Sequence, residues 1–150
     1  MIPFVLFSIV VNSEALAVPK TAVAPPPAVV PVPAAGLVIA LTTGVEDGSM
    51  FASAFRHARV AKQSGLLPEI TVIVYGRAIL VVDPAVKAAD DARKELVAAR
   101  EAGVRIVVCA NSLEKYGIDP AVVAPYGEVV PSAIEEIAAL VARGHEVMNY

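Results

Sequence analysis

The sequence has little of what reactive and metal-binding sites are usually built from. Its 150 residues include one cysteine, two histidines and no tryptophan, and aromatic residues make up only 5%. A lone cysteine excludes a disulfide within the chain. Closed structural zinc sites need several Cys and His ligands, so we expect neither a metal nor a resident cofactor. The interior must be built from aliphatic side chains, which suits a parallel sheet covered by helices.

Basic charge is scarce as well. Twelve Lys and Arg are outnumbered by fifteen Asp and Glu, which gives a formal net charge of −3 and a pI near 5.3. Without a basic stripe, we expect no nucleic-acid partner, and there is no polybasic segment for anionic lipid. Amides are also few, with glutamine only at Gln63. Low amide content is often seen in thermophilic proteins, but it leaves the source open.

Residues 1–18 form an apolar N-terminal segment that has two interpretations. The run from Ile2 to Val11 is followed by Ala-Leu-Ala at 15–17, the form of a signal-peptidase site, although no Lys or Arg precedes it. The competing interpretation is a β-strand arm that pairs with the sheet of a neighbouring subunit. The run is too short to span a membrane unaided. The protein is therefore exported or extracellular if Met1–Ala17 acts as a leader, and otherwise cytoplasmic.

Residues 19–35 are rich in Pro, Ala and Val. Six prolines between Pro19 and Pro33 favour extended polyproline II over helix or central strand. At about 3.1 Å per residue, residues 19–33 reach on the order of 45 Å. We expect a semi-rigid extended linker that can deliver the preceding segment to a neighbouring molecule. A disordered tether is the alternative.

Residues 36–150 alternate between strand and helix patterns. Continuous apolar runs predict buried strands at 37–41, 70–75 and 104–108, and shorter strands are expected at 128–130 and around 147–148. Capping residues and helical spacing predict helices from Asp47 or Ser49 to Gly65, from the Asp83-Pro84 pair to residue 102, from Asn111 to Gly117, and from Ser132 to Gly144. Such alternation implies right-handed crossovers. We therefore predict a three-layer α/β/α domain with a mostly parallel five-stranded sheet.

Several titratable residues of these elements are predicted to be structural. Asp90 and Lys94 stand four residues apart in the order that favours an ion pair on a solvated helix face. His57 is expected at the surface of the first helix or between subunits, and His145 is expected to be exposed. None of these residues is assigned chemistry.

Cys109 is the one candidate reactive group. Ligands of open α/β sheets bind at the carboxyl ends of the strands, and Cys109 directly follows the third predicted strand. Ala110, Asn111 and Ser112 come next, where a helix N-terminus would stabilise a thiolate over a thiol. The alternative is a buried inert cysteine, because cysteine often serves as a small apolar core residue.

Other patterns of catalytic residues are weak or missing. No Gly-rich phosphate loop with Lys, no Ser/His/Asp arrangement and no paired-carboxylate motif stands out. Thr43 and Gly44 follow the first predicted strand and are expected to line the same cleft as Cys109. As a nucleotide site this loop is a weak signal.

Four stretches of this domain resemble the DsrE/DsrF-like family along nearly all of residues 36–150. They are GVRIVVCANSL from Gly103, Gly117-Ile118, VPSA from Val130, and GHEV from Gly144. The resemblance implies an α/β domain that commonly forms trimers or hexamers. In sulfur-relay members such as DsrE and TusD it also implies a persulfide on the cysteine that matches Cys109. The chain departs from the family in its N-terminal extension and in Ala133, where many relatives have glycine.

Two functions of different classes follow. The first is a DsrE-like sulfur-relay carrier or sulfurtransferase-like protein, in which Cys109 accepts sulfane sulfur and passes it to another thiol, such as that of a sulfur-carrier protein. The second is a structural homo-oligomer or filament subunit that donates its N-terminal strand to a neighbour. Both imply self-association as a trimer, hexamer or polymer. An open thiol favours the relay, and a buried thiol with a docked arm favours assembly.

Overall fold

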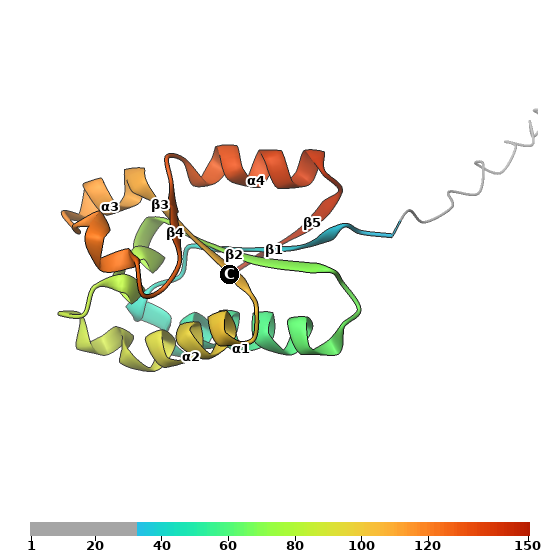
Figure 1. Ribbon diagram of the computed structural model, residues 1–150. Coiled ribbons are helices and arrows are strands. Elements are labelled where there is room, and N and C mark those ends of the chain that lie inside the picture. Colours follow the sequence, from blue (N-terminus) through green and yellow to red (C-terminus); the bar gives the residue numbers. More distant parts are fainter. Residues whose placement is uncertain (1–32) are drawn as a thin grey trace, which may run out of the picture. The chain divides into compact units, whose positions relative to one another are not determined.

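A five-stranded parallel sheet forms the centre of the molecule (Figure 1). The computed structural model describes residues 33–150, and within them the strand order is β4-β3-β2-β1-β5, with every neighbouring pair parallel. The strands are β1 (Gly36–Leu41), β2 (Glu69–Val74), β3 (Arg105–Cys109), β4 (Glu128–Val130) and β5 (His145–Asn149). The predicted fold class and strand count are confirmed. The proposed N-terminal strand or leader and most of the linker lie outside the described residues.

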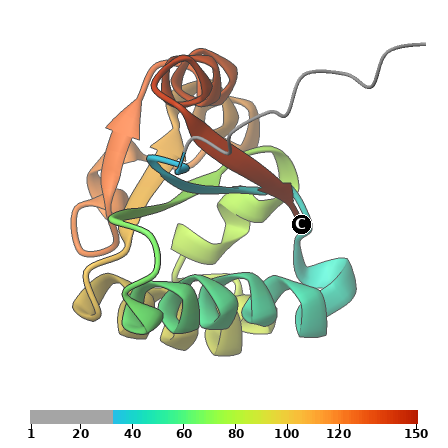
Figure 2. The same cartoon turned by 90° about the vertical axis from the view of Figure 1, so that its right-hand side faces the viewer.

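Helices cover both faces of this sheet. In Figure 1, α1 (Gly48–Ser64) and α2 (Asp90–Glu101) lie below the sheet, and α4 (Ala133–Ala142) lies above it. The short α3 (Ala110–Tyr116) follows β3, and Figure 2 shows the same three layers from the side. None of the helices in residues 33–150 is both long and apolar enough to cross a membrane.

The first helix begins and ends as predicted. The Asp47 carboxylate accepts a hydrogen bond from the Met50 amide at 3.0 Å, which caps α1, and Gly65 ends the helix with a φ of 67°.

The start predicted for the second helix, at the Asp83-Pro84 pair, is wrong. The chain forms 3₁₀ helices at Gly76–Val82 and Lys87–Ala89, and α2 begins only at Asp90. The Asp83 carboxylate accepts from the Ala85 amide at 2.9 Å instead of capping α2. The side chain of Arg93 donates to the carbonyl oxygens of residues 81, 83 and 86. This guanidinium satisfies carbonyls that a longer helix would have paired internally.

The expected Asp90–Lys94 pair is wrong too. Arg93 pairs with Asp90, and Lys94 pairs with Asp91 at 3.1 Å, so both contacts have a spacing of three. His57 is exposed on α1 as predicted, and its Nδ1 lies 2.5 Å from the Tyr150 hydroxyl.

His145 is buried, with 6% of its surface exposed, which corrects the expectation that it is exposed. Its Nδ1 lies 3.0 Å from the Leu140 carbonyl oxygen, and its Nε2 lies 3.1 Å from a Glu69 carboxylate oxygen. The imidazole fits because Gly36 is its partner on β1: a Cβ at position 36 would lie 2.6 Å from the ring. One small residue far away in the sequence thus decides the burial of His145.

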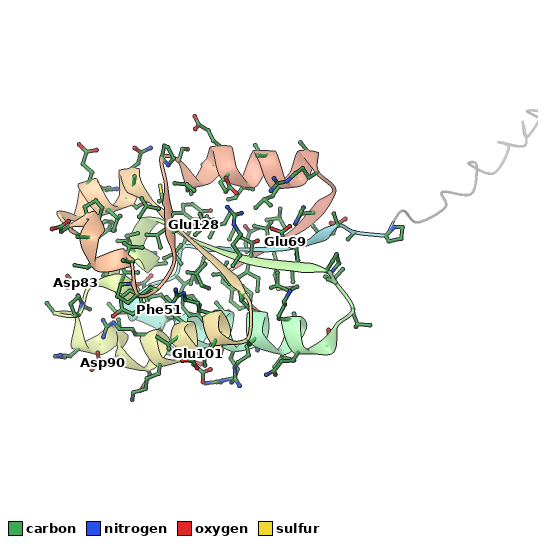
Figure 3. The ribbon with its side chains drawn as sticks, viewed as in Figure 1. Phe51, Glu69, Asp83, Asp90, Glu101 and Glu128 are labelled. Carbon is green, nitrogen blue, oxygen red and sulfur yellow. The ribbon has the colours of Figure 1, made fainter. Side chains whose placement is uncertain are left out.

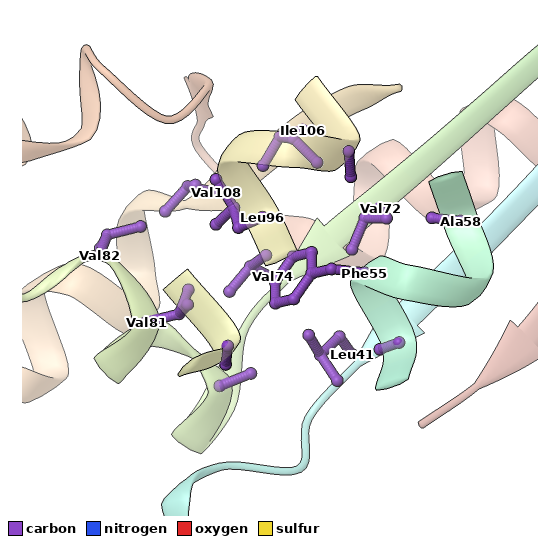
Figure 4. Close-up of a cluster of buried hydrophobic side chains, with 14 of the residues drawn as sticks. Leu41, Phe55, Ala58, Val72, Val74, Val81, Val82, Leu96, Ile106 and Val108 are labelled. Atoms are coloured by element: carbon purple, nitrogen blue, oxygen red, sulfur yellow. The ribbon is translucent and has the colours of Figure 1, made fainter. Parts of the chain in front are cut away.

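The two faces of the sheet differ in character. The larger apolar cluster joins the sheet to α1 and α2, and Figure 4 shows Phe55 and Leu96 packed among strand residues such as Val72. The α4 face has a smaller apolar cluster, with charged residues at the amino ends of the strands. There Arg105 binds Glu128, which Figure 3 labels, and it binds Glu136 at 2.7 Å. Burial alone would lower the pKa of Arg105, but these two carboxylates raise it.

Candidate functional site

Cys109 is the last residue of β3, at the carboxyl edge of the sheet where the sequence placed it. Its thiol lies on the α4 face, in the small cluster formed by Val38, Ile73, Val107, Ala133 and Leu140. Only 5% of the residue is exposed. The partly buried side chains of Tyr75, Val130 and Ile137 pack against this cluster. The thiol therefore has the predicted position, but it is enclosed.

The N-terminus of α4 points a backbone donor at this thiol. The amide of Ala133, the first residue of α4, donates to the Cys109 Sγ at 3.4 Å. Two local features bring them together: Val130 of β4 pairs with Cys109, and the Ser132 hydroxyl caps α4 by accepting from the Glu135 amide. A helix N-terminus has unpaired amides and a partial positive charge. The start of α4 therefore presents a backbone hydrogen-bond donor to the sulfur.

The residues after Cys109 tie the site to neighbouring segments. α3 begins at Ala110, so the prediction that Asn111 caps this helix is wrong. Ala110 is half-buried and Asn111 is exposed, with its amide 3.4 Å from the Pro131 carbonyl oxygen. The buried Ser112 hydroxyl accepts from the Gly76 amide at 2.9 Å. Ser112 therefore fixes β3 and α3 to the end of β2.

Thr43 and Gly44 lie beyond β1, and the strand order puts β2 between them and Cys109. Two strand spacings separate them laterally by roughly 10 Å. The Thr43 amide donates to the Tyr150 carbonyl oxygen at 3.2 Å, and the Gly44 amide donates to the Glu46 carboxylate at 3.0 Å. The Gly44 hydrogen bond is the main cause of the lowered pKa of Glu46. Both amides are thus already engaged, which leaves neither for a phosphate group.

Two residues near the thiol were not predicted from the sequence: Ala133, whose amide donates to Cys109, and Tyr75, which packs against the surrounding cluster. The capping residues Ser132 and Glu135 were a usable signal, because they place a helix N-terminus directly after a strand that ends at the carboxyl edge. Tyr75 had no comparable signal beyond its position at the end of the second strand.

Two cavities lie away from the thiol. One, of about 480 Å³, lies between α1 and α2, and its charged residues are paired with each other, Arg56 with Glu95 and Lys94 with Asp91. The other, of about 440 Å³, lies beside α2 and Tyr126. Within residues 33–150 no three His, Cys, Asp or Glu residues group in a way that could hold a metal ion.

Comparison with known proteins identifies the domain. The model of the DsrE/DsrF-like family matches residues 36–150, which include every strand and helix described above. The chain belongs to the DsrE/DsrF-like family. No curated protein matches the sequence.

Two solved structures resemble this DsrE/DsrF-like domain. A conserved protein of unknown function from Bacteroides thetaiotaomicron is 20% identical with a TM-score of 0.62, over 77% of this chain and 95% of its own. A protein of unknown function from Methanobacterium thermoautotrophicum is also 20% identical with a TM-score of 0.55, over 77% of this chain and 97% of its own. At this identity the likeness supports the fold alone.

Proposed function

We propose that this DsrE/DsrF-like protein carries sulfane sulfur as a persulfide on Cys109. The observation that carries the proposal is the Ala133 amide 3.4 Å from the Sγ, at the N-terminus of α4. A persulfide is anionic at neutral pH, and the charge on its outer sulfur, next to Sγ, gains from the partial positive charge of the helix N-terminus. The family resemblance supports this role, since relay members carry sulfur on the matching cysteine.

The chemistry needs no redox cofactor. The Cys109 thiol gives its proton to solvent, and the thiolate attacks the outer sulfur of a sulfane donor such as thiosulfate. The donor's S–S bond breaks, sulfite leaves with the electron pair, and a new S–S bond forms on Cys109. An acceptor thiolate then attacks the terminal sulfur and releases the Cys109 thiolate. A sulfur-carrier protein is the proposed acceptor.

Burial of the thiol makes a specific demand on this reaction. With 5% of its surface exposed, Cys109 leaves little room for a reagent, and Tyr75 and Ile137 pack against the cluster that contains it. Small sulfur donors therefore have an advantage over bulky reagents. For each reagent, the rate of Cys109 modification in the folded protein can be divided by the rate in the unfolded protein. We expect this ratio to be higher for thiosulfate and polysulfide than for a bulky maleimide.

The test is intact mass spectrometry of the full chain after incubation with polysulfide or thiosulfate. The proposal predicts a gain of one sulfur atom that a reducing agent removes, and no gain in Cys109→Ser. Ser112→Ala is the matched control, because it alters a buried polar group of the same segment and leaves the thiol in place. An unmodified wild type, or sulfur retained by Cys109→Ser, contradicts the relay.

The second candidate function is a structural homo-oligomer or filament subunit built from the same domain. The observation that favours it is the burial of Cys109, which a purely structural residue would also show. The strand donation of this hypothesis rests on residues 1–18, outside the described residues. Two results together would favour this candidate. The wild type would take up no sulfur, and the Cys109→Ala chain would assemble as the wild type does.

A further inference from the structure

The sheet has two edges, and they differ in their capacity to pair. β4 is three residues long, is followed by Pro131, and has Glu128 paired with Arg105. Short edge strands with charge and proline resist further pairing. β5 is five residues long and pairs only with β1 in the described part of the chain. Within residues 33–150, the outer edge of β5 (His145–Asn149), called here the β5 edge, is therefore the one that can pair with another strand.

The hydrogen bonds between the β5 and β1 segments show which backbone groups of β5 point outward. The Gly144 carbonyl oxygen accepts from the Ala35 amide, and the Tyr150 amide donates to the Ala40 carbonyl oxygen, so residues 144 and 150 face β1. Backbone groups alternate between the two sides of a strand. The N–H and C=O of residues 145, 147 and 149 consequently point away from β1, toward the β5 edge.

Apolar side chains border the β5 edge on both faces. The His145 ring contacts Leu140 of α4, so Val147, two residues on, also faces α4, and Met148 faces the opposite side. Val147 is 38% exposed and Met148 is 44% exposed.

The nearest flank of α4 is apolar as well. Leu140 points into the sheet, and Glu136 reaches Arg105 on the β3 side. At about 100° per residue, Ile134 and Val141 then lie on the opposite flank, toward β1 and β5. They are 62% and 48% exposed. An exposed apolar flank beside a free strand edge is typical of an interface.

We propose that the β5 edge pairs antiparallel with the β5 edge of a second copy of this chain, with a two-fold axis at Val147. This register aligns each outward-facing residue of β5 with an outward-facing residue of the second copy. Val147 lies opposite Val147, and His145 lies opposite Asn149. Glu146 lies opposite Met148 of the second copy, so the carboxylates are not directly opposed. The β5 edge is thus self-complementary, as an isologous interface requires.

A second copy fits these surfaces better than a single donated strand. A strand added to the β5 edge covers Val147 and Met148 but leaves the α4 flank exposed. A two-fold axis perpendicular to the sheet places both α4 helices on the same face, flank toward flank. This pairing covers Ile134 and Val141 in addition to the strand edge.

Cysteine pairs test the register directly in full-length chains that carry Cys109→Ala. Val147→Cys should form a covalent dimer under mild oxidation, because opposed residues of antiparallel strands lie within disulfide reach. Glu146→Cys and Met148→Cys should cross-link when mixed, and much less when each is alone. Val60→Cys, 57% exposed on α1, is the control for random collision and should stay monomeric. Equal cross-linking at all four positions, or none at Val147→Cys, overturns the proposal.

A second measurement keeps the native thiol and adds no cysteine. Val147→Pro removes an outward-facing N–H and leaves the hydrogen bonds between β1 and β5 intact. The dimer dissociation constant, from analytical ultracentrifugation of the full chain, should rise at least about tenfold. Val147→Thr keeps the donor and the branched shape, so its effect should be much smaller. A wild type that is monomeric, or a Val147→Pro chain with unchanged mass, refutes the pairing. If deletion of residues 1–18 abolishes the dimer, a donated arm occupies the β5 edge instead.

Discussion

Replacing Ala133 by proline removes the backbone hydrogen-bond donor from the thiol and suits the backbone conformation at the start of α4. Ala133 is the first residue of α4, a position where proline is favoured because its N–H has no partner within the helix. Ser132 has φ −138° and ψ 125°, the extended conformation that a following proline requires. The serine hydroxyl also keeps its bond to the Glu135 amide. Ala133→Pro therefore removes the N–H···S interaction and keeps the capped start of α4.

The expected size of the effect follows from this single contact. Hydrogen bonds to charged groups contribute about 1.5–3 kcal/mol, and the 3.4 Å distance to sulfur favours the lower end. A loss of about 1.4 kcal/mol corresponds to a roughly tenfold change in an equilibrium constant. A less stabilised thiolate is also more nucleophilic, and this offsets about half of the logarithm of the tenfold factor in the rate of modification. We expect the rate of Cys109 modification to fall about threefold, and persulfide formation at equilibrium to fall about tenfold.

The assay compares Ala133→Pro with Ala133→Gly, which keeps the N–H. Rates are measured by intact mass under polysulfide, and persulfide occupancy is measured at fixed donor concentration. Extra ring atoms at a buried position cost about 1–3 kcal/mol when they do not fit. Far-UV spectra and unfolding temperatures are therefore measured to establish that both variants are folded. Equal rates and occupancies in the two folded variants would refute the claim that the α4 amide stabilises anionic sulfur.

Three further predictions concern the domain itself. Gly36→Ala should lower the free energy of unfolding by about 1–3 kcal/mol in a denaturant titration, because its Cβ would lie 2.5 Å from a carbonyl oxygen of β2; Gly48→Ala, with open space around it, is the control. Because the Gly44 amide and then Arg77 lower the pKa of Glu46 from 4.5, the carboxylate stabilises the fold above that pH and loses this contribution as pH falls through the lowered value. Unfolding of Glu46→Gln followed between pH 3 and 7, a range of about four units, should therefore show a smaller loss of stability on acidification. A chain that begins at Ala35 should unfold cooperatively with a native near-UV spectrum, since every strand and helix that the structure describes lies between Gly36 and Asn149.

Patterns within short stretches of the sequence predicted the fold well, but they could not predict contacts between residues far apart in the chain. Apolar runs gave all five strands, and the Asp47 cap and Gly65 gave the limits of α1. The Asp83-Pro84 pair has the local form of a helix start, but the guanidinium of Arg93 holds this segment in another conformation. The burial of His145 likewise depends on a glycine 109 positions earlier in the chain, as the pairing of Gly36 with His145 shows. No window of adjacent residues contains these relations.

The position of Cys109 was predictable for the same reason, and its burial was not. Ligand sites of parallel sheets lie at the carboxyl ends of the strands, so the place of Cys109 after β3 could be predicted. Its burial comes from a cluster that includes Ala133 and Leu140 of α4 and has Tyr75 packed against it. Enclosure alone does not decide between an inert and a reactive thiol. An inert apolar cysteine needs only packing, whereas a sulfur carrier also needs a donor for its anion. The Ala133 amide at the capped start of α4 is such a donor, and this contact is the reason for proposing a carrier instead of a purely structural cysteine.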